Sequence, residues 1–175
     1  SLSFFIEKVR KNIRDMIILG MIQSGKTGEI IQMTYFCIRY LKIPVIILIQ
    51  NKTSGYLQLE HRIKEFSNSL RSYNIHCKYV KTGLKKTSSV KVFDIENPAT
   101  QVYICSSNYK QLEKFEDNLK HVIIMKKRMK PYALIMDEYD DLIKSRQDDL
   151  DLEPKCRVEP HIKYLRENSF INVGV

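Results

Sequence analysis

The sequence lacks any long hydrophobic run. No apolar stretch in its 175 residues approaches the roughly 20 that a helix needs to cross a bilayer. Residues 1–6 are soon followed by charged residues and lack the layout of a secretory signal peptide. We therefore expect no membrane association and an intracellular location. A serine at position 1 is typical of a processed or truncated chain.

Paired cysteines and clustered histidines are also lacking. The four cysteines include no C-x-x-C pair, and the four histidines are scattered without metal-ligand spacing. These absences argue against a structural zinc site. Cys37, Cys77 and Cys105 lie within apolar patterns, which indicates free, buried thiols in a reducing compartment.

Internal repeats and interdomain linkers are lacking as well. The length suits a single domain, residues 1–175, with its own core. Hydrophobic residues make up 43% and charged residues 28%, which argues against a disordered chain. The net charge is +9 although acidic residues gather in residues 137–153, so the rest is strongly basic. Such charge suits a phosphate-backbone partner, although by itself it also fits ordinary solubility.

The sequence does contain a phosphate-binding motif. Residues 20–27 read GMIQSGKT and fit the P-loop pattern G-x-x-x-x-G-K-[ST]. In this loop, backbone N–H groups wrap the phosphates of a nucleoside triphosphate, the lysine meets the β and γ phosphates, and the threonine hydroxyl ligates Mg²⁺. The candidate ATP-binding residues are Gly20, Gln23, Ser24, Gly25, Lys26 and Thr27, with Thr27 also a candidate Mg²⁺ ligand.

The neighbouring residues place this motif in a suitable context. Residues 16–19 form a short apolar run typical of a buried parallel strand. Apolar residues recur at helical spacing through residues 26–41, which predicts an amphipathic helix whose N-terminus faces the phosphates. Residues 45–49 predict the next buried strand. Together they form one βαβ unit, which makes a chance match to the P-loop pattern less plausible.

A second motif lies downstream, where an apolar strand at residues 133–136 ends in Asp137 and Glu138. In open α/β sheets, ligands bind at the carboxyl edge of the strands, where these two acids would lie. One carboxylate would hold Mg²⁺, and the next would orient and deprotonate the attacking water. We assign Asp137 to the metal and Glu138 to the water. Alone, the pair would also fit a solvated acidic turn.

The rest of the chain alternates between helical and strand patterns. Helices are predicted near residues 5–13, 55–72, 111–128 and 159–168, and strands near residues 75–80, 102–105 and 170–175. Residues 81–97 are polar and irregular and predict a loop or a short hairpin. This alternation predicts a three-layer α/β/α fold with a mostly parallel sheet covered on both faces.

The two nucleotide motifs carry a resemblance to a known family. Residues 137–140 read DEYD, of the form Asp-Glu-x-Asp, and follow the Gly-Lys-Thr loop at a suitable separation. The chain therefore resembles the first, N-terminal RecA-like ATPase domain of superfamily 2 helicases and translocases. It lacks an upstream glutamine motif and a Thr-Pro-x-Arg segment, so it is more similar to divergent viral or phage members than to DEAD-box RNA helicases. A viral factory joins the cytoplasm and nucleus as an expected location.

The resemblance implies a function and further site residues. Family members are nucleic-acid-dependent ATPases that use Mg²⁺ and ATP, here with Lys26 and Glu138 as the catalytic residues. Segments after two strands contact DNA or RNA in the family, and the corresponding residues here are Asn51, Lys52, Thr53 and Asn108. The family also completes its site with arginines from a second RecA-like domain, so we expect this chain alone to hydrolyse ATP only weakly.

Two alternatives remain open from the sequence. The loop at residues 20–27 also resembles that of type II thymidine kinases, which would make the chain a small-molecule kinase. Those enzymes carry their acidic pair nearer the loop and usually a cysteine-pair zinc ribbon, and this chain has no C-x-x-C. The other alternative is a non-catalytic nucleotide-binding interaction module, against which the presence of all four residues Lys26, Thr27, Asp137 and Glu138 argues.

Overall fold

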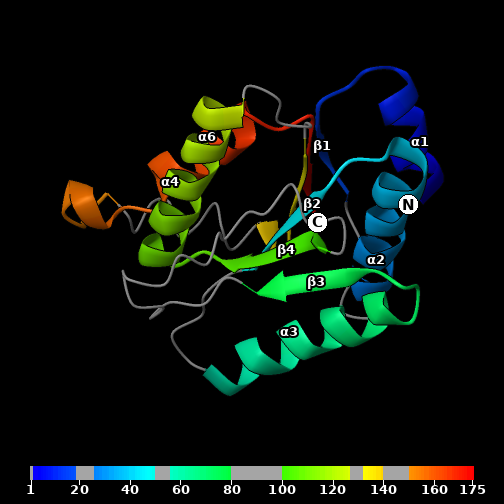
Figure 1. Ribbon diagram of the computed structural model, residues 1–175, viewed down its shortest axis with the longest axis horizontal. Coiled ribbons are helices and arrows are strands. Elements are labelled where there is room, and N and C mark those ends of the chain that lie inside the picture. The colour runs from blue at the N-terminus through cyan, green and yellow to red at the C-terminus, as the bar shows by residue number, and fades with distance from the viewer. Residues whose placement is uncertain (1, 19–25, 50–55, 80–99, 127–131, 140–149) are drawn as a thin grey trace.

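The structure, a computed structural model, describes residues 2–18, 26–49, 56–79, 100–126, 132–139 and 150–175. Six strands form one sheet in which all neighbouring strands run parallel, in the order β1-β6-β5-β2-β4-β3 (Figure 1). The strands are β1 (Asp15–Ile17), β2 (Val45–Ile49), β3 (His76–Tyr79), β4 (Thr100–Ser106), β5 (Ala133–Met136) and β6 (Ile171–Gly174).

Helices cover both faces of this sheet. They are α1 (Leu2–Arg10), α2 (Lys26–Phe36), a π-helical segment η1 (Cys37–Leu41), α3 (Tyr56–Arg71), α4 (Tyr109–Lys126), a 3₁₀ turn η2 (Pro154–Cys156) and α6 (Glu159–Glu167). In Figure 1, α4 and α6 lie together on one side of the strands, while α1 and α2 lie on the other. The predicted three-layer α/β/α fold with a parallel sheet is therefore confirmed.

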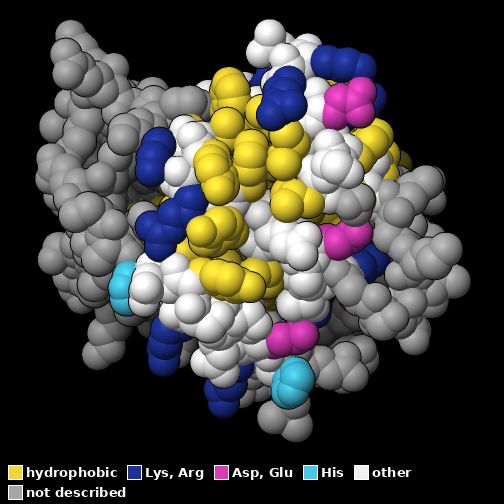
Figure 2. All heavy atoms as spheres, turned by 90° about the vertical axis from the view of Figure 1, so that its right-hand side faces the viewer, with side chains coloured by type: hydrophobic (Ala, Val, Ile, Leu, Met, Phe, Trp, Pro, Cys, Tyr) yellow, Lys and Arg dark blue, Asp and Glu magenta, His cyan; other side chains and the backbone are white. Residues whose placement is uncertain are grey.

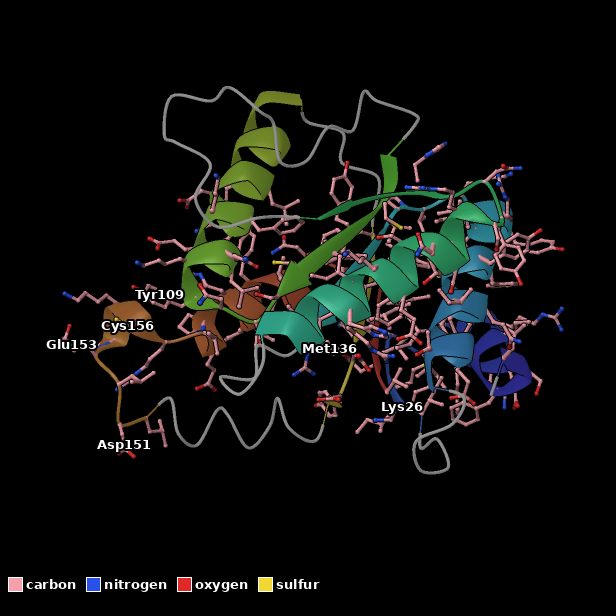
Figure 3. The ribbon with its side chains drawn as sticks, turned by 90° about the horizontal axis from the view of Figure 1, so that it is seen from below. Lys26, Tyr109, Met136, Asp151, Glu153 and Cys156 are labelled. Carbon is pink, nitrogen blue, oxygen red and sulfur yellow. The ribbon has the colours of Figure 1, made fainter. Side chains whose placement is uncertain are left out.

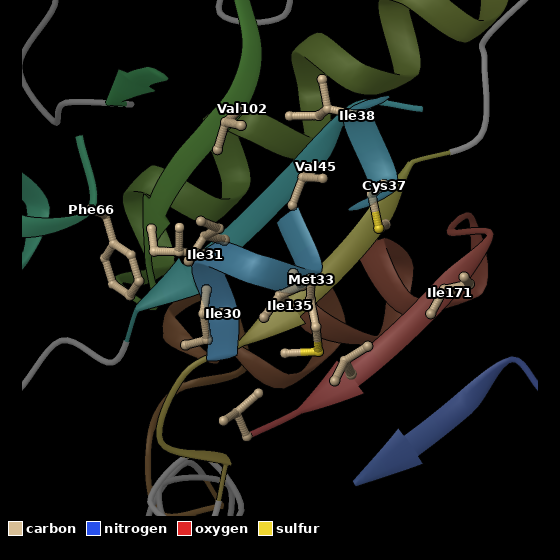
Figure 4. Packing of buried hydrophobic residues seen from close by; sticks show 14 of the residues in the cluster. Ile30, Ile31, Met33, Cys37, Ile38, Val45, Phe66, Val102, Ile135 and Ile171 are labelled. Atoms are coloured by element: carbon tan, nitrogen blue, oxygen red, sulfur yellow. The ribbon is translucent and has the colours of Figure 1, made fainter. Parts of the chain in front are cut away.

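The alternation of side chains along the strands explains these layers. Successive strand residues point to opposite faces of a sheet. In β2, Val45 and Ile47 belong to the core beneath α1, α2 and α3, whereas Ile46 and Leu48 belong to the core beneath α4 and α6. Because both faces are covered, all five residues of β2 are buried. Figure 4 shows the first of these cores, where residues of α2 pack against the strands.

Most predicted elements agree with the structure to within a few residues. The strands predicted at residues 45–49 and 133–136 have the observed bounds of β2 and β5. The helix predicted at residues 26–41 has the expected limits, but its last five residues form the π-helix η1. Lys42 ends it in the left-handed conformation, with a φ of 58°. The predicted segment at residues 81–97 lies outside the described residues.

The first strand differs from its prediction. We expected a buried strand at residues 16–19, but β1 spans Asp15–Ile17 at one edge of the described sheet, and the side chain of Ile17 is 53% exposed. An apolar run specifies a strand, whereas its position in the sheet depends on which distant segment pairs with it. Here β1 pairs with β6 on one side.

One face of the molecule exposes a group of apolar side chains. Apolar side chains gather between lysines and arginines on the face seen in Figure 2, which is the side of the molecule that carries α1 and α2. Phe4 of α1 and Tyr40 of η1 are among the exposed large apolar residues. The ring of Tyr40 stacks on the ring of Phe36, with 5.3 Å between the two ring centroids. Among the described helices, none has the length and apolarity needed to cross a membrane.

Candidate nucleotide site

The carboxyl ends of three parallel strands define the candidate site. Ile17 of β1 and Met136 of β5 are both in register with Gly174 of β6. β1 and β5 therefore end at the same edge of the sheet. One strand, β6, lies between β1 and β5 in the sheet.

Helix α2 begins at this edge with two of the predicted site residues. Lys26 and Thr27 are its first two residues and are both half-buried. The first N–H groups of a helix have no partner within the helix and favour an anion. Figure 3 labels Lys26 together with Met136, the residue before Asp137. The predicted ATP-binding residues Gly20, Gln23, Ser24 and Gly25 lie outside the described residues.

Asp137 is held rigidly at the end of β5. Its backbone N–H donates to the carbonyl of Leu48 in β2 at 2.9 Å, and the residue is only 1% exposed. Burial raises the pKa of its carboxyl group, and the charge of Glu138 adds to this, while Arg62 and Lys26 oppose it. Asp137 thus lies close enough to Lys26 and Glu138 for their charges to matter, as a shared site requires.

Arg62 of α3 joins the two nucleotide motifs. Its Nε donates to Asp137 Oδ2 at 3.1 Å, and its Nη2 lies 3.0 Å from the same oxygen. Its Nη1 donates to the hydroxyl oxygen of Thr27. One guanidinium group therefore binds the proposed metal-ligating side chains of both motifs at once, although 75 residues separate Arg62 from Asp137 along the chain.

Two further contacts fix the position of this arginine. Nη1 of Arg62 also lies 3.1 Å from Glu65 Oε2, one turn along α3. The guanidinium carbon lies 4.6 Å from the centre of the Phe66 ring, a side chain that is fully buried. A cation over an aromatic face is stabilised electrostatically. The side chain of Arg62 is 25% exposed and that of Asp137 only 2%, so their ion pair is largely shielded from water.

Glu138, the candidate base, has an unusual backbone conformation. Its φ is 52°, in the left-handed region that residues with a side chain adopt at a cost of about 1–3 kcal/mol. The neighbouring Tyr139 is fixed by a backbone hydrogen bond from its N–H to the carbonyl of Val175 at 3.1 Å. The turn after β5 is therefore tied to the end of β6. Such strained residues cluster at functional sites.

The residues at this edge fit a magnesium ion. Oδ1 of Asp137 is buried and has no hydrogen-bond partner among the described residues. A second oxygen ligand is available from the hydroxyl of Thr27, which shares the Arg62 guanidinium with Asp137. Mg²⁺ takes oxygen ligands and commonly uses one or two carboxylates, with waters and substrate phosphates completing its shell. Within the described ranges, no three His, Cys, Asp or Glu side chains form a metal cluster, and a site of this kind does not need one.

The structure describes only one of the four residues predicted to contact nucleic acid. Asn51, Lys52 and Thr53 lie outside the described residues. Asn108 lies directly before α4, where its Oδ1 accepts a hydrogen bond from the backbone N–H of Lys110 at 3.0 Å. This is the geometry of a helix N-cap. Asn108 therefore has a structural role, and its contact with nucleic acid stays a prediction.

Sequence reasoning did not single out two polar residues that form hydrogen bonds at the ends of β5 and β4. Arg62 was one, because nothing in its local pattern sets it apart from other surface-facing helical residues. Gln111 was the other. It is 5% exposed, and its Oε1 accepts hydrogen bonds from the backbone N–H and the hydroxyl of Ser106 at 3.2 and 2.6 Å. The available signal was its position four residues before Phe115, on the face of the helix that carries the apolar residues.

Comparison with known proteins does not identify the chain. No protein-family model matches it, and no curated protein matches it significantly. The function must therefore be argued from the site itself.

Proposed function

We propose that this chain is the ATP-binding domain of a nucleic-acid-dependent ATPase of the helicase type, acting on DNA or RNA. The observation that carries the proposal is the meeting of two distant motifs at one sheet edge. Thr27 and Asp137 come from α2 and from the end of β5, yet both contact the guanidinium of Arg62. Two motifs that each predict Mg-nucleotide binding thus supply side chains to the same place.

The proposed reaction is hydrolysis of the terminal phosphoanhydride of ATP to ADP and phosphate. Lys26, at the N-terminus of α2, would stabilise the negative charge on the phosphates. Glu138 would accept a proton from water as its oxygen attacks the γ-phosphorus. When bound, Mg²⁺ would neutralise phosphate charge, with Thr27 and Asp137 as its protein-side ligands. A second RecA-like domain would supply the arginines that complete the site.

Calorimetric titration with Mg-ADP and Mg-ATP tests the proposal. We expect wild-type protein to bind both nucleotides and Lys26→Ala to lose most of this binding, because the variant lacks the phosphate-facing ammonium group. Lys64→Ala is the matched control, since Lys64 is an exposed lysine on α3 and its loss removes the same charge. We expect the control to bind as the wild type does.

Three results would contradict the proposal. Equal binding by the wild type and Lys26→Ala would mean that the phosphates lie elsewhere. No binding by the wild type would favour a non-catalytic module that retains only the fold as an interaction surface. Phosphorylation of thymidine by the wild type would instead favour the kinase alternative.

A further inference from the structure

The position of Arg62 has a consequence for metal binding at the proposed site. Its guanidinium lies between the Thr27 hydroxyl and Asp137 Oδ2, the two groups proposed to ligate Mg²⁺. Magnesium requires its oxygen ligands, or the waters that bridge to them, at about 2.0–2.1 Å. A hydrated ion bound through the Asp137 carboxylate and the Thr27 hydroxyl would occupy the space that the guanidinium fills, so the two cations compete for the same pair of side chains.

We propose that Arg62 is a resident cation at the magnesium position, so that metal binding must displace it and its contacts set the metal affinity of the site. The biological role of this competition rests on the proposed nucleotide function. The competition itself, between a metal ion and Arg62 for Thr27 and Asp137, can be measured without a nucleotide.

Charge balance explains why a cation is needed here before the metal arrives. The Asp137 side chain is 2% exposed, and a buried carboxylate without a partner is strongly destabilising. Arg62 supplies that partner with two nitrogen atoms on Oδ2. Among the described residues Oδ1 has no hydrogen-bond partner, so the contacts with Arg62 involve only one of the two carboxylate oxygens.

The structure also provides a place for Arg62 after displacement. Glu65 already lies 3.1 Å from its Nη1, and the Glu65 side chain is 39% exposed. Loss of the contacts with Thr27 and Asp137 would thus leave the guanidinium paired with a carboxylate on its own helix and nearer to solvent. Because Arg62 belongs to α3, metal occupancy would also change how α3 is tied to the end of β5.

The test measures metal binding directly, with Mn²⁺ as the probe and electron paramagnetic resonance as the readout, in the absence of nucleotide. Arg62→Met keeps an unbranched side chain that can pack on the Phe66 ring but removes the competing charge. We expect it to bind Mn²⁺ about tenfold more tightly than wild type, within the usual range of coupling between two ligands of one site. Lys64→Met removes an equal charge from an exposed position of α3 and is expected to leave the affinity unchanged.

A second measurement covers the nucleotide-bound site. The ratio of ADP affinity in Mg²⁺ to ADP affinity in EDTA should be about tenfold higher for Arg62→Met than for wild type. Arg62→Lys retains the charge without the planar fork and should lie between the two. It also provides a folded variant if Arg62→Met proves too unstable to purify.

The outcomes separate this inference from the proposed function. If Arg62→Met and Arg62→Lys gain no Mn²⁺ affinity, the inference is wrong even where wild type binds nucleotide. If Arg62→Met loses ADP affinity equally in Mg²⁺ and in EDTA, Arg62 is a phosphate ligand and the inference is also overturned. If Mn²⁺ affinity rises while wild type binds no nucleotide, the inference holds and the proposed function fails.

Discussion

Gly174 occupies a position where the structure leaves no room for a side chain. A Cβ atom at this position would lie 2.6 Å from Cγ of Tyr139, a shorter distance than Cβ atoms keep from non-bonded atoms in real proteins. We expect Gly174→Ala to destabilise the protein by about 1–3 kcal/mol, the usual effect of overpacking, because the Tyr139 ring must move. Urea unfolding of the purified variant measures this free energy.

Two further variants make the Gly174 experiment specific. Gly28 in α2 has nothing within 4 Å of a built Cβ, so Gly28→Ala should be neutral or stabilise the helix by up to about 1 kcal/mol. Combining Gly174→Ala with Tyr139→Ala should recover part of the loss, because the clash disappears. Strictly additive losses in the double variant would show that the Tyr139 ring is not the obstacle.

Local sequence patterns pointed to some of the candidate site residues and not to others. Lys26, Thr27 and Asp137 were singled out as candidates because their motifs combine residue type with spacing, and both are local properties. Arg62 could not be found in this way, since its partners lie 35 and 75 residues away along the chain. The capping role of Asn108 lay within reach, because an asparagine directly before a helix is a common N-cap.

At the scale of elements, one polar cluster joins α4 to α6. Glu116 of α4 forms a hydrogen-bonded pair with Nδ1 of His161 on α6, and Lys120 lies 3.0 Å from the same carboxyl group. Burial by itself would raise the pKa of Glu116, but the hydrogen bonds from His161 and Lys120 outweigh it, so the pKa lies below its ordinary value of 4.5. The ionised form of Glu116 is therefore favoured by folding.

This cluster predicts a pH-dependent contribution to stability. Because the folded-state pKa of Glu116 is lowered, its stabilisation is fully present above about pH 4.5 and is lost as the pH falls through the folded-state pKa. We expect Glu116→Gln to cost on the order of 1 kcal/mol at pH 6–7 and progressively less at lower pH. Urea unfolding of the wild type and variant across this range measures the difference.

Glu113→Gln is the matched control for Glu116, since Glu113 is an exposed glutamate on the same helix. We expect this variant to follow the wild type at every pH. If the difference between Glu116→Gln and wild type stayed constant down to pH 3, the ion pair would not be its cause.

The helices and strands could be predicted where their hydrophobic patterns lie in consecutive residues. The uninterrupted apolar residues of β2 specify a strand buried on both faces, and its bounds were predicted correctly. The π-helical end of α2 was not predicted, because apolar spacing does not distinguish an α-helical turn from a wider one. The edge position of β1 was also missed, because pairing with β6 involves residues more than 150 positions away.

At the scale of the whole molecule, the proposed function implies an incomplete catalytic site. An arginine supplied from outside the nucleotide-binding core raises hydrolysis rates by about 10³–10⁵-fold in GTPases. We expect this chain alone to release phosphate from ATP at least about 10³-fold more slowly than a complete motor. A phosphate-release assay with Mg-ATP measures this rate.

The residual rate of hydrolysis provides its own control. Glu138→Gln should reduce it to background while ADP binding is retained, because the amide cannot accept the proton from water. Hydrolysis by the wild type at the rate of a complete motor would refute the expectation of an incomplete site.

Net charge leads to the last prediction. The chain carries +9, so binding to a single-stranded oligonucleotide should be dominated by phosphate contacts and weaken as salt rises. We expect affinity to fall roughly tenfold or more between 50 and 200 mM salt, a drop that about three phosphate contacts would produce. Fluorescence anisotropy measures the slope, and an affinity that does not change with salt would exclude this mode of binding.

The sequence by itself determined the parallel α/β architecture and the bounds of its central strands, and it proposed two acidic residues and two residues of the P-loop pattern as site candidates. Those features follow from periodicity and from motifs that span a few consecutive residues. Only the tertiary structure decided the strand order, the edge position of β1 and the insertion of Arg62 between Thr27 and Asp137. These depend on contacts between distant segments, whose geometry no local pattern encodes.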